Sequence, residues 1–157
     1  MVFENWIASL ISMLLSLAGV SSSVQDSVIY VPSLDHRFVV TLSCVDFVGI
    51  SLWASMFVFV VWVYVSLNGI TVSRRRYALY GALGFVIFFS ANILRMFVEI
   101  LYVSSAGASF AGYLVQWQAF EEQVGMGIMF ATLAALLVGF HFMSRKKLPV
   151  VTPHVRV

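Results

Sequence analysis

Charged side chains are scarce in this chain: Asp, Glu, Lys and Arg make up only 10% of its 157 residues, against about 25% in an ordinary soluble domain. Hydrophobic residues account for 61% of the sequence. This balance excludes an ordinary soluble enzyme and indicates an integral membrane protein with a single domain, residues 1–157. The basic runs resemble no nucleic-acid-binding motif, so no nucleic-acid partner is expected.

Residues that bind metals and cofactors are also few. Cys44 is the only cysteine, which excludes an internal disulfide and a metal site built from several cysteines. Of the three histidines, His141 lies at the far end of its hydrophobic segment, His154 lies in the C-terminal tail, and His36 alone lies near Cys44. No cluster of His, Asp and Glu has the spacing of metal ligands. Neither a metal nor another cofactor is expected.

Long hydrophobic runs are abundant. Four segments approach the roughly 20 apolar residues that a membrane span requires: residues 2–20, 45–67, 77–103 and 120–143. The first is the weakest and also resembles a signal peptide, because the small residues Ser21–Ser23 follow it, but it lacks a basic n-region, which favours a retained helix. The expected fold is an all-α integral membrane protein, a four-helix transmembrane bundle.

Basic residues predict the orientation of these spans. Arg74–Arg76 lie between the second and third spans, and Arg145–Lys147 follow the fourth, so four spans bring both groups to one side. Cytoplasmic loops carry an excess of Lys and Arg. We therefore expect a multi-pass protein of the cell membrane with both termini in the cytoplasm and with residues 21–44 and 104–120 outside.

The first outer segment has features of a small β-structure. Residues 28–31 and 38–41 are β-prone runs, and the turn residues of Pro32–His36 separate them. We expect a short outer β-hairpin that leads directly into Cys44. Asp46, two residues later, is suited to the positive end of a helix dipole at the start of the next span.

Several polar residues are predicted to lie at one depth in the membrane. Because a helix rises 1.5 Å per residue, Arg95 lies about 27 Å beyond Tyr77, near the outer edge of a hydrocarbon core about 30 Å thick. Cys44 precedes the second span, and Glu121 and Glu122 open the fourth, at the same edge. A charge within a membrane segment indicates a functional site.

Two further residues share the face of Arg95. Asn92, Arg95 and Glu99 follow helical spacing and lie on one side of the third span. Structural explanations remain open for the charged residues and for the cysteine. Cys44 could be a small hydrophobic residue, Arg95 could snorkel or pair with Glu99, and Glu121 and Glu122 could be interfacial charges.

With these residues placed, about residues 10–143 resemble the exosortase/archaeosortase family of membrane cysteine transpeptidases. The similarity lies in a β-prone outer loop before Cys44, a basic inner loop, the Asn92-Ile93-Leu94-Arg95 pattern, and Glu121 four residues before Gly125. The sequence departs from the family pattern in two respects. Val45-Asp46 replaces a small residue and a glycine after the cysteine, and Glu121 stands where the family has a basic residue.

The resemblance implies a membrane thiol peptidase or transpeptidase that cleaves C-terminal sorting signals of secreted surface proteins on the outer face of the membrane. Its partner would be a tail made of a motif, a single helix and a basic end, and a membrane lipid or another amine would be the acceptor. Cys44, Arg95 and Glu121 would form the catalytic set, and the supporting residues would be Asn92, Glu99, Glu122 and His36.

Chemistry restricts the role of each member of this set. A nearby cation favours a thiolate, and Arg95 could also stabilise an oxyanion, but a guanidinium cannot act as a base. Glu121 is therefore the candidate proton acceptor, although a carboxylate beside a thiol disfavours the thiolate. We expect Glu121 to hold Arg95 in position rather than to activate Cys44 directly.

Two other functions remain open. The chain could be a small non-enzymatic transmembrane subunit of a larger complex with partner membrane subunits. It could also be a degenerate sortase relative that binds tails without cleaving them. The changed residues after Cys44 and at Glu121 favour both of these alternatives.

Overall fold

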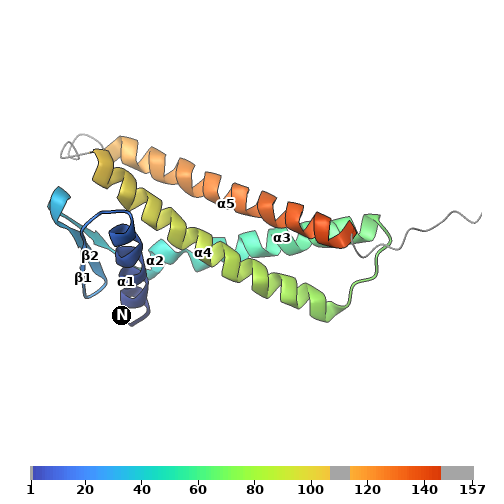
Figure 1. The fold of residues 1–157 in the computed structure, drawn as a ribbon. Coiled ribbons are helices and arrows are strands. Elements are labelled where there is room, and N and C mark those ends of the chain that lie inside the picture. Colours follow the sequence, from blue (N-terminus) through green and yellow to red (C-terminus); the bar gives the residue numbers. More distant parts are fainter. Residues whose placement is uncertain (1, 107–113, 146–157) are drawn as a thin grey trace, which may run out of the picture.

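The computed structural model describes residues 2–106 and 114–145 of the chain. Its elements are, in chain order, α1 (Val2–Leu17), β1 (Ser23–Gln25), β2 (Val28–Val31), η1 (Pro32–Leu34), β3 (His36–Val39), α2 (Leu42–Val45), α3 (Phe47–Leu67), α4 (Arg74–Ala106) and α5 (Leu114–Arg145). Figure 1 shows α3, α4 and α5 extending away from a small assembly of α1 and the strands. The predicted helical fold with a short β-structure is therefore present in outline.

Among the described residues, three helical stretches are long and apolar enough to cross a membrane: Leu42–Leu67, Arg74–Ser105 and Phe120–Ser144. α4 ends and α5 begins close together next to the sheet, and the two helices diverge toward the other end (Figure 1). Their shared core contains Phe57 and Val61 of α3, Phe88 of α4 and Leu133 of α5. These three helices correspond to the second, third and fourth predicted spans.

The first predicted span differs from the expectation. α1 has 16 residues and therefore rises about 24 Å, less than the hydrocarbon core of about 30 Å. It ends early because Gly19 adopts a positive φ of 81° and the Val20 amide donates to the Leu15 carbonyl, a glycine cap that closes the helix. Figure 1 shows α1 running across the end of α4 beside the sheet. A fourth transmembrane helix is thus not confirmed.

The outer segment forms a three-stranded antiparallel sheet with the order β1-β2-β3. The predicted hairpin is confirmed as β2 and β3, which the turn at Pro32–Leu34 connects, while β1 was not anticipated. The β2 side chains Ile29 and Val31 are fully buried, as are Ile7 and Ile11 of α1. Burial of these apolar groups keeps α1 on the sheet rather than in the bundle.

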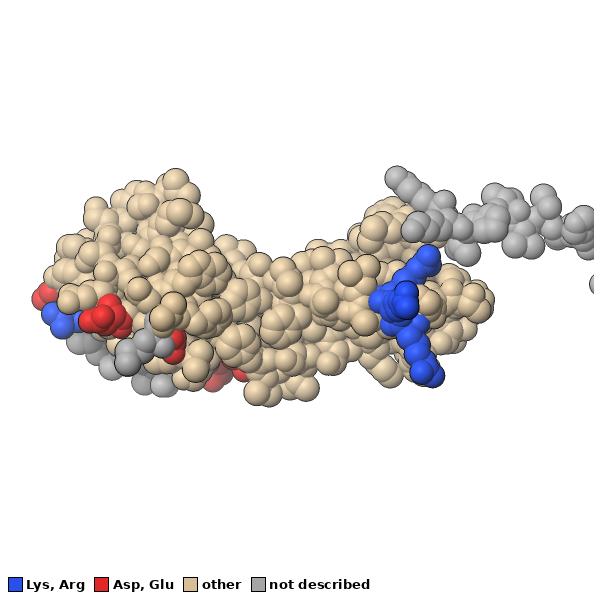
Figure 2. Space-filling model, turned by 90° about the horizontal axis from the view of Figure 1, so that it is seen from below, with Lys and Arg blue, Asp and Glu red and all other residues tan. Residues whose placement is uncertain are grey.

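Charges are separated along the molecule. Figure 2 shows acidic side chains gathered toward the sheet end and the arginines that open α4 at the opposite end. This arrangement agrees with the charge asymmetry from which the orientation was predicted. The prediction that both termini are cytoplasmic required α1 to be a span, whereas the start of the chain lies at the sheet end (Figure 1).

Candidate functional site

The candidate nucleophile lies on a short helix that a single residue separates from the first long span. Cys44 belongs to α2. Asp46 interrupts the helical conformation between α2 and α3, because its φ of 46° is left-handed. The Asp46 carboxylate accepts a hydrogen bond from the Gly49 amide at 3.0 Å and so caps α3. The predicted acidic residue at a helix start is confirmed. A side chain at Gly49 would collide with this carboxylate.

Asn92 connects α4 to the chain at Cys44. Its side chain is 1% exposed, and its Nδ2 donates to the carbonyl oxygens of Cys44 at 3.0 Å and Val45 at 2.9 Å. These carbonyls end a helix and would otherwise lack donors. The other polar atom, Asn92 Oδ1, has no hydrogen-bond partner among the described residues.

A hollow of about 740 Å³ lies between α3, α4 and α5 at this level. Its lining consists of Asp46, Gly49, Trp53, Asn92, Arg95, Glu121, Glu122, Gly125, Met126 and Met129. Trp53 meets Phe130 of α5 edge-on, with ring centroids 4.9 Å apart, which joins α3 to α5 below the polar residues. Of the predicted site residues, the structure brings Asn92, Arg95, Glu121 and Glu122 together around this hollow.

Arg95 lies between α4 and α5. Its Nε is 3.2 Å from Glu99 Oε1, which confirms the ion pair that helical spacing allowed. A Cβ at Gly125 would lie 3.0 Å from Arg95 Cδ. The absence of a side chain at Gly125 therefore leaves room for the Arg95 side chain against α5. Neither Arg95 Nε nor Glu99 Oε1 has a properly directed hydrogen bond within the described part of the chain.

The lining of the hollow carries more acidic than basic side chains. Asp46, Glu121 and Glu122 contribute three carboxylates to its lining, and Arg95 contributes the one guanidinium, which is already paired with Glu99. Carboxylates attract a bound cation. The electrostatics of the hollow therefore suit an ammonium group.

The thiol of Cys44 lies outside this lining. Its Sγ is 3.3 Å from Thr41 Oγ1 and 3.8 Å from the Val39 carbonyl oxygen, and its side chain is partly exposed. The connection to the hollow runs through Asn92 and Asp46 rather than through a contact with Arg95. His36 lies at the start of β3, about 10 Å along the strand from Val39, and it does not line the hollow.

The free sheet edge beside Cys44 was not predicted from the sequence. The Val40 amide donates to the Ser27 carbonyl at 2.9 Å, and Val28 pairs with Val39. Because hydrogen-bonded and non-bonded pairs alternate in an antiparallel ladder, the backbone groups of Arg37 and Val39 point away from β2. Among the described residues β3 is an edge strand, and the Cys44 thiol contacts the last carbonyl on that edge.

A shallow hollow of about 550 Å³ lies on the sheet face that carries the Arg37 and Val39 side chains. Tyr30 and Asp26 also line it, and the Arg37 guanidinium lies 6.0 Å from the centre of the Tyr30 ring. The alternation of residues in β3 would have indicated this face, but it could not show which edge of the sheet is free.

No protein-family model, no curated protein and no solved structure matches the chain. What the site can do is therefore inferred from its own residues and their geometry.

Proposed function

We propose that the chain is a membrane thiol peptidase or transpeptidase that cleaves C-terminal sorting signals on the outer face of the cell membrane, as its resemblance to exosortases and archaeosortases implies. The observation that supports this most is the convergence of Asn92, Arg95 and Glu121 on one hollow, with Asn92 bonded to the carbonyl of Cys44. Asn92 Oδ1 is buried without a hydrogen bond, so a bound substrate can supply its partner.

The reaction has two transfers at one carbonyl carbon. The Cys44 sulfur attacks the carbonyl of the tail, a C–S bond forms, the C–N bond breaks and the departing amine takes up a proton. A neutral acceptor amine then attacks the thioester, so a new C–N bond forms, the C–S bond breaks, and the proton that the amine loses returns to the Cys44 sulfur. Arg95 stabilises the oxyanion in both steps, and Glu121 positions Arg95.

The edge of β3 offers a way to hold the substrate. An extended tail segment added to this edge would pair with the backbone groups of Arg37 and Val39. A carbonyl paired at Val39 lies next to the Cys44 thiol, because that thiol contacts the Val39 carbonyl. The side chains of the segment would meet the shallow hollow at Tyr30 and Arg37.

The acidic hollow suits the acceptor. An amine of a lipid or another molecule is an ammonium ion before it reacts, and the carboxylates of Asp46, Glu121 and Glu122 attract such a cation. Asn92 Oδ1 adds an unused acceptor at the same place. These residues thereby recruit the group that resolves the thioester.

The test is the alkylation rate of Cys44 in bilayer-reconstituted protein, measured with a membrane-impermeant maleimide. We expect labelling from the sheet side, abolished in Cys44→Ser and several-fold slower in Arg95→Gln, because the guanidinium favours the thiolate. Arg76→Gln is the charge-matched control and should label at the wild-type rate. An unreactive Cys44, or equal rates in the two arginine variants, would contradict the proposal.

The second candidate is a non-enzymatic membrane subunit. The observation that favours it is the open surface of α5. Only 17% of the apolar stretch of this helix is buried inside the structure. In addition, no described atom lies within 4 Å of a Cβ added at Gly127 or Gly139. Small residues on an open helix face suit a partner helix. A subunit would co-purify in fixed ratio with other chains and would tolerate Cys44→Ser.

A tail-binding relative without cleavage is the third outcome. It would retain a co-expressed tail protein on the β3 edge and release no fragment. Detection of the cleaved tail by mass spectrometry separates it from the enzyme, with Cys44→Ser as the reference for a site that binds but cannot react.

A further inference from the structure

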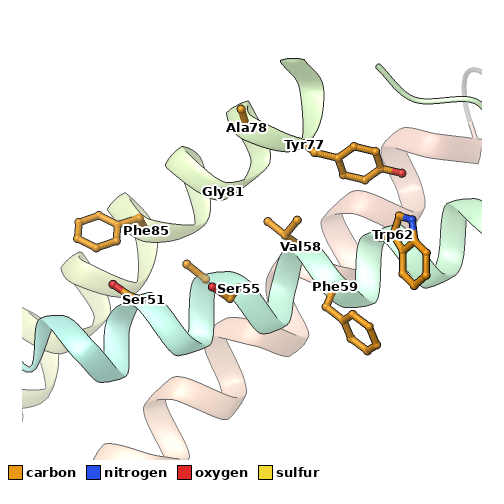
Figure 3. A pocket seen from close by; sticks show the side chains of 10 residues that line it. Ser51, Ser55, Val58, Phe59, Trp62, Tyr77, Ala78, Gly81 and Phe85 are labelled. Carbon is orange, nitrogen blue, oxygen red and sulfur yellow. The ribbon is translucent and has the colours of Figure 1, made fainter. Parts of the chain in front are cut away.

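A second cavity lies within the membrane-spanning part, on a different face of the bundle from the polar hollow. An open groove of about 740 Å³ lies between α3 and α4. Figure 3 shows Val58 and Trp62 on the α3 wall and Tyr77, Ala78 and Phe85 on the α4 wall. Its surface is mostly apolar, and none of its residues belongs to the candidate site.

The dimensions of the groove match one leaflet of a bilayer. Its α3 wall runs from Ser51 to Trp62, which is about 16 Å at 1.5 Å per residue. Its α4 wall runs from Tyr77 to Phe85, about 12 Å by the same rise. Half of a hydrocarbon core about 30 Å thick is roughly 15 Å. The groove therefore has the length of a single acyl chain.

A positive charge lies at the mouth of the groove. Arg74 opens α4, and it precedes Ala78, Gly81 and Phe85 by four, seven and eleven residues, so it shares their helix face. Arg76 lies on a different side, where it lines a separate hollow with Tyr80 and Phe140. The aromatic residues Trp62 and Tyr77 lie toward the basic end of the groove, as is typical of residues at a membrane–water interface.

The groove is narrow at its floor. α3 and α4 approach closely at its floor, where a Cβ at Gly81 would lie 3.6 Å from Val58 Cγ2. A thin, flexible chain fits such a space.

We propose that this groove binds one anionic phospholipid from the leaflet at the basic end, with an acyl chain between α3 and α4 and the phosphate on Arg74. A guanidinium binds phosphate through paired hydrogen bonds, and a net negative headgroup adds attraction that a zwitterionic one lacks. The lipid would hold the diverging ends of α3 and α4 at a fixed separation.

The experiment uses the full chain in bilayers with equal amounts of phosphatidylglycerol and phosphatidylcholine of the same chain length. The protein is extracted into detergent, and native mass spectrometry identifies the lipid that stays bound. We expect one phospholipid per chain, with phosphatidylglycerol retained roughly fivefold over phosphatidylcholine. Arg74→Gln should remove this preference, whereas Arg76→Gln should keep it.

Filling the groove is the second arm of the test. Ala78→Leu should abolish lipid retention, and Ala82→Leu, the same change at an exposed α4 position outside the groove lining, should not. Ser55→Leu on the opposite wall replaces Ala78→Leu if that variant fails to fold, as judged by circular dichroism. Equal retention of the two lipids by wild type, or equal loss in Ala78→Leu and Ala82→Leu, would overturn the proposal. So would a two-chain mass that Ala78→Leu dissociates, which would assign the groove to a second copy.

Discussion

At the scale of single residues, two glycines shape the candidate site by leaving room for polar side chains. Gly49 leaves space for the Asp46 carboxylate that caps α3, and Gly125 leaves space for Arg95. Sequence spacing predicted the common depth of Arg95 and Glu121, because helical rise is regular. It could not predict where the Cys44 thiol points, since that depends on the left-handed turn at Asp46.

Gly49→Ala should destabilise the protein, because the new methyl group collides with the Asp46 carboxylate and the α3 cap is lost. Loss of such a cap costs about 1 kcal/mol. Thermal unfolding in detergent measures the effect. Gly127→Ala is the matched control, since nothing lies within 4 Å of its added methyl group, and it should not lower the unfolding temperature. A stable Gly49→Ala would mean that Asp46 can turn away without cost.

Asn92→Ala should leave the carbonyls of Cys44 and Val45 without donors and should cost about 1–3 kcal/mol. We also expect a changed maleimide rate at Cys44, because α2 is released from α4. Ser90→Ala serves as the control, since the Ser90 hydroxyl bonds to a carbonyl of its own helix. Wild-type stability together with a wild-type labelling rate in Asn92→Ala would show that Asn92 does not position Cys44.

At the scale of elements, the sequence predicted the three long helices because each is a continuous apolar run. It also predicted the β2–β3 hairpin from two β-prone runs around a turn. It missed β1, since Ser23–Gln25 is too short and polar to show a pattern. It overestimated α1, because hydropathy reports apolar residues without distinguishing burial in protein from burial in lipid.

The edge of β3 permits a test with proline, which removes one backbone donor. Val39→Pro should keep the sheet, since the Val39 amide points away from β2 and proline is tolerated on edge strands. It should prevent cleavage of a co-expressed tail protein, because the substrate strand loses its donor. Fragment analysis by mass spectrometry measures this. Val40→Pro should instead unfold the sheet by removing the bond to Ser27, and undiminished cleavage in Val39→Pro would exclude binding at this edge.

At the scale of the whole molecule, the separation of charge and the position of α1 determine the expected topology. The arginines that open α4 lie at one end, and the sheet, α1 and the candidate site lie at the other (Figures 1 and 2). If the basic end is cytoplasmic, three spans leave the N-terminus outside with the sheet. The sequence predicted four spans with both termini in the cytoplasm, whereas the described residues contain three stretches of membrane-spanning length.

Single cysteines in a Cys44→Ser background test this topology. Asn5→Cys on α1 should be labelled by an impermeant maleimide from the same side as Gln25→Cys, and from the opposite side to Ser73→Cys beside the basic run. Intact cells and inverted vesicles supply the two sides. Labelling of Asn5→Cys together with Ser73→Cys would instead support α1 as a fourth span.

The lining of the polar hollow has a consequence for the order of synthesis. Asp46 and Arg95 emerge from the ribosome well before Glu121, Glu122 and Gly125, which belong to the last helix. Until α5 is made and inserted, Arg95 has no glycine to lie against and the hollow has no third wall. A nascent chain that lacks α5 therefore carries its cysteine without the surroundings that the proposed chemistry needs.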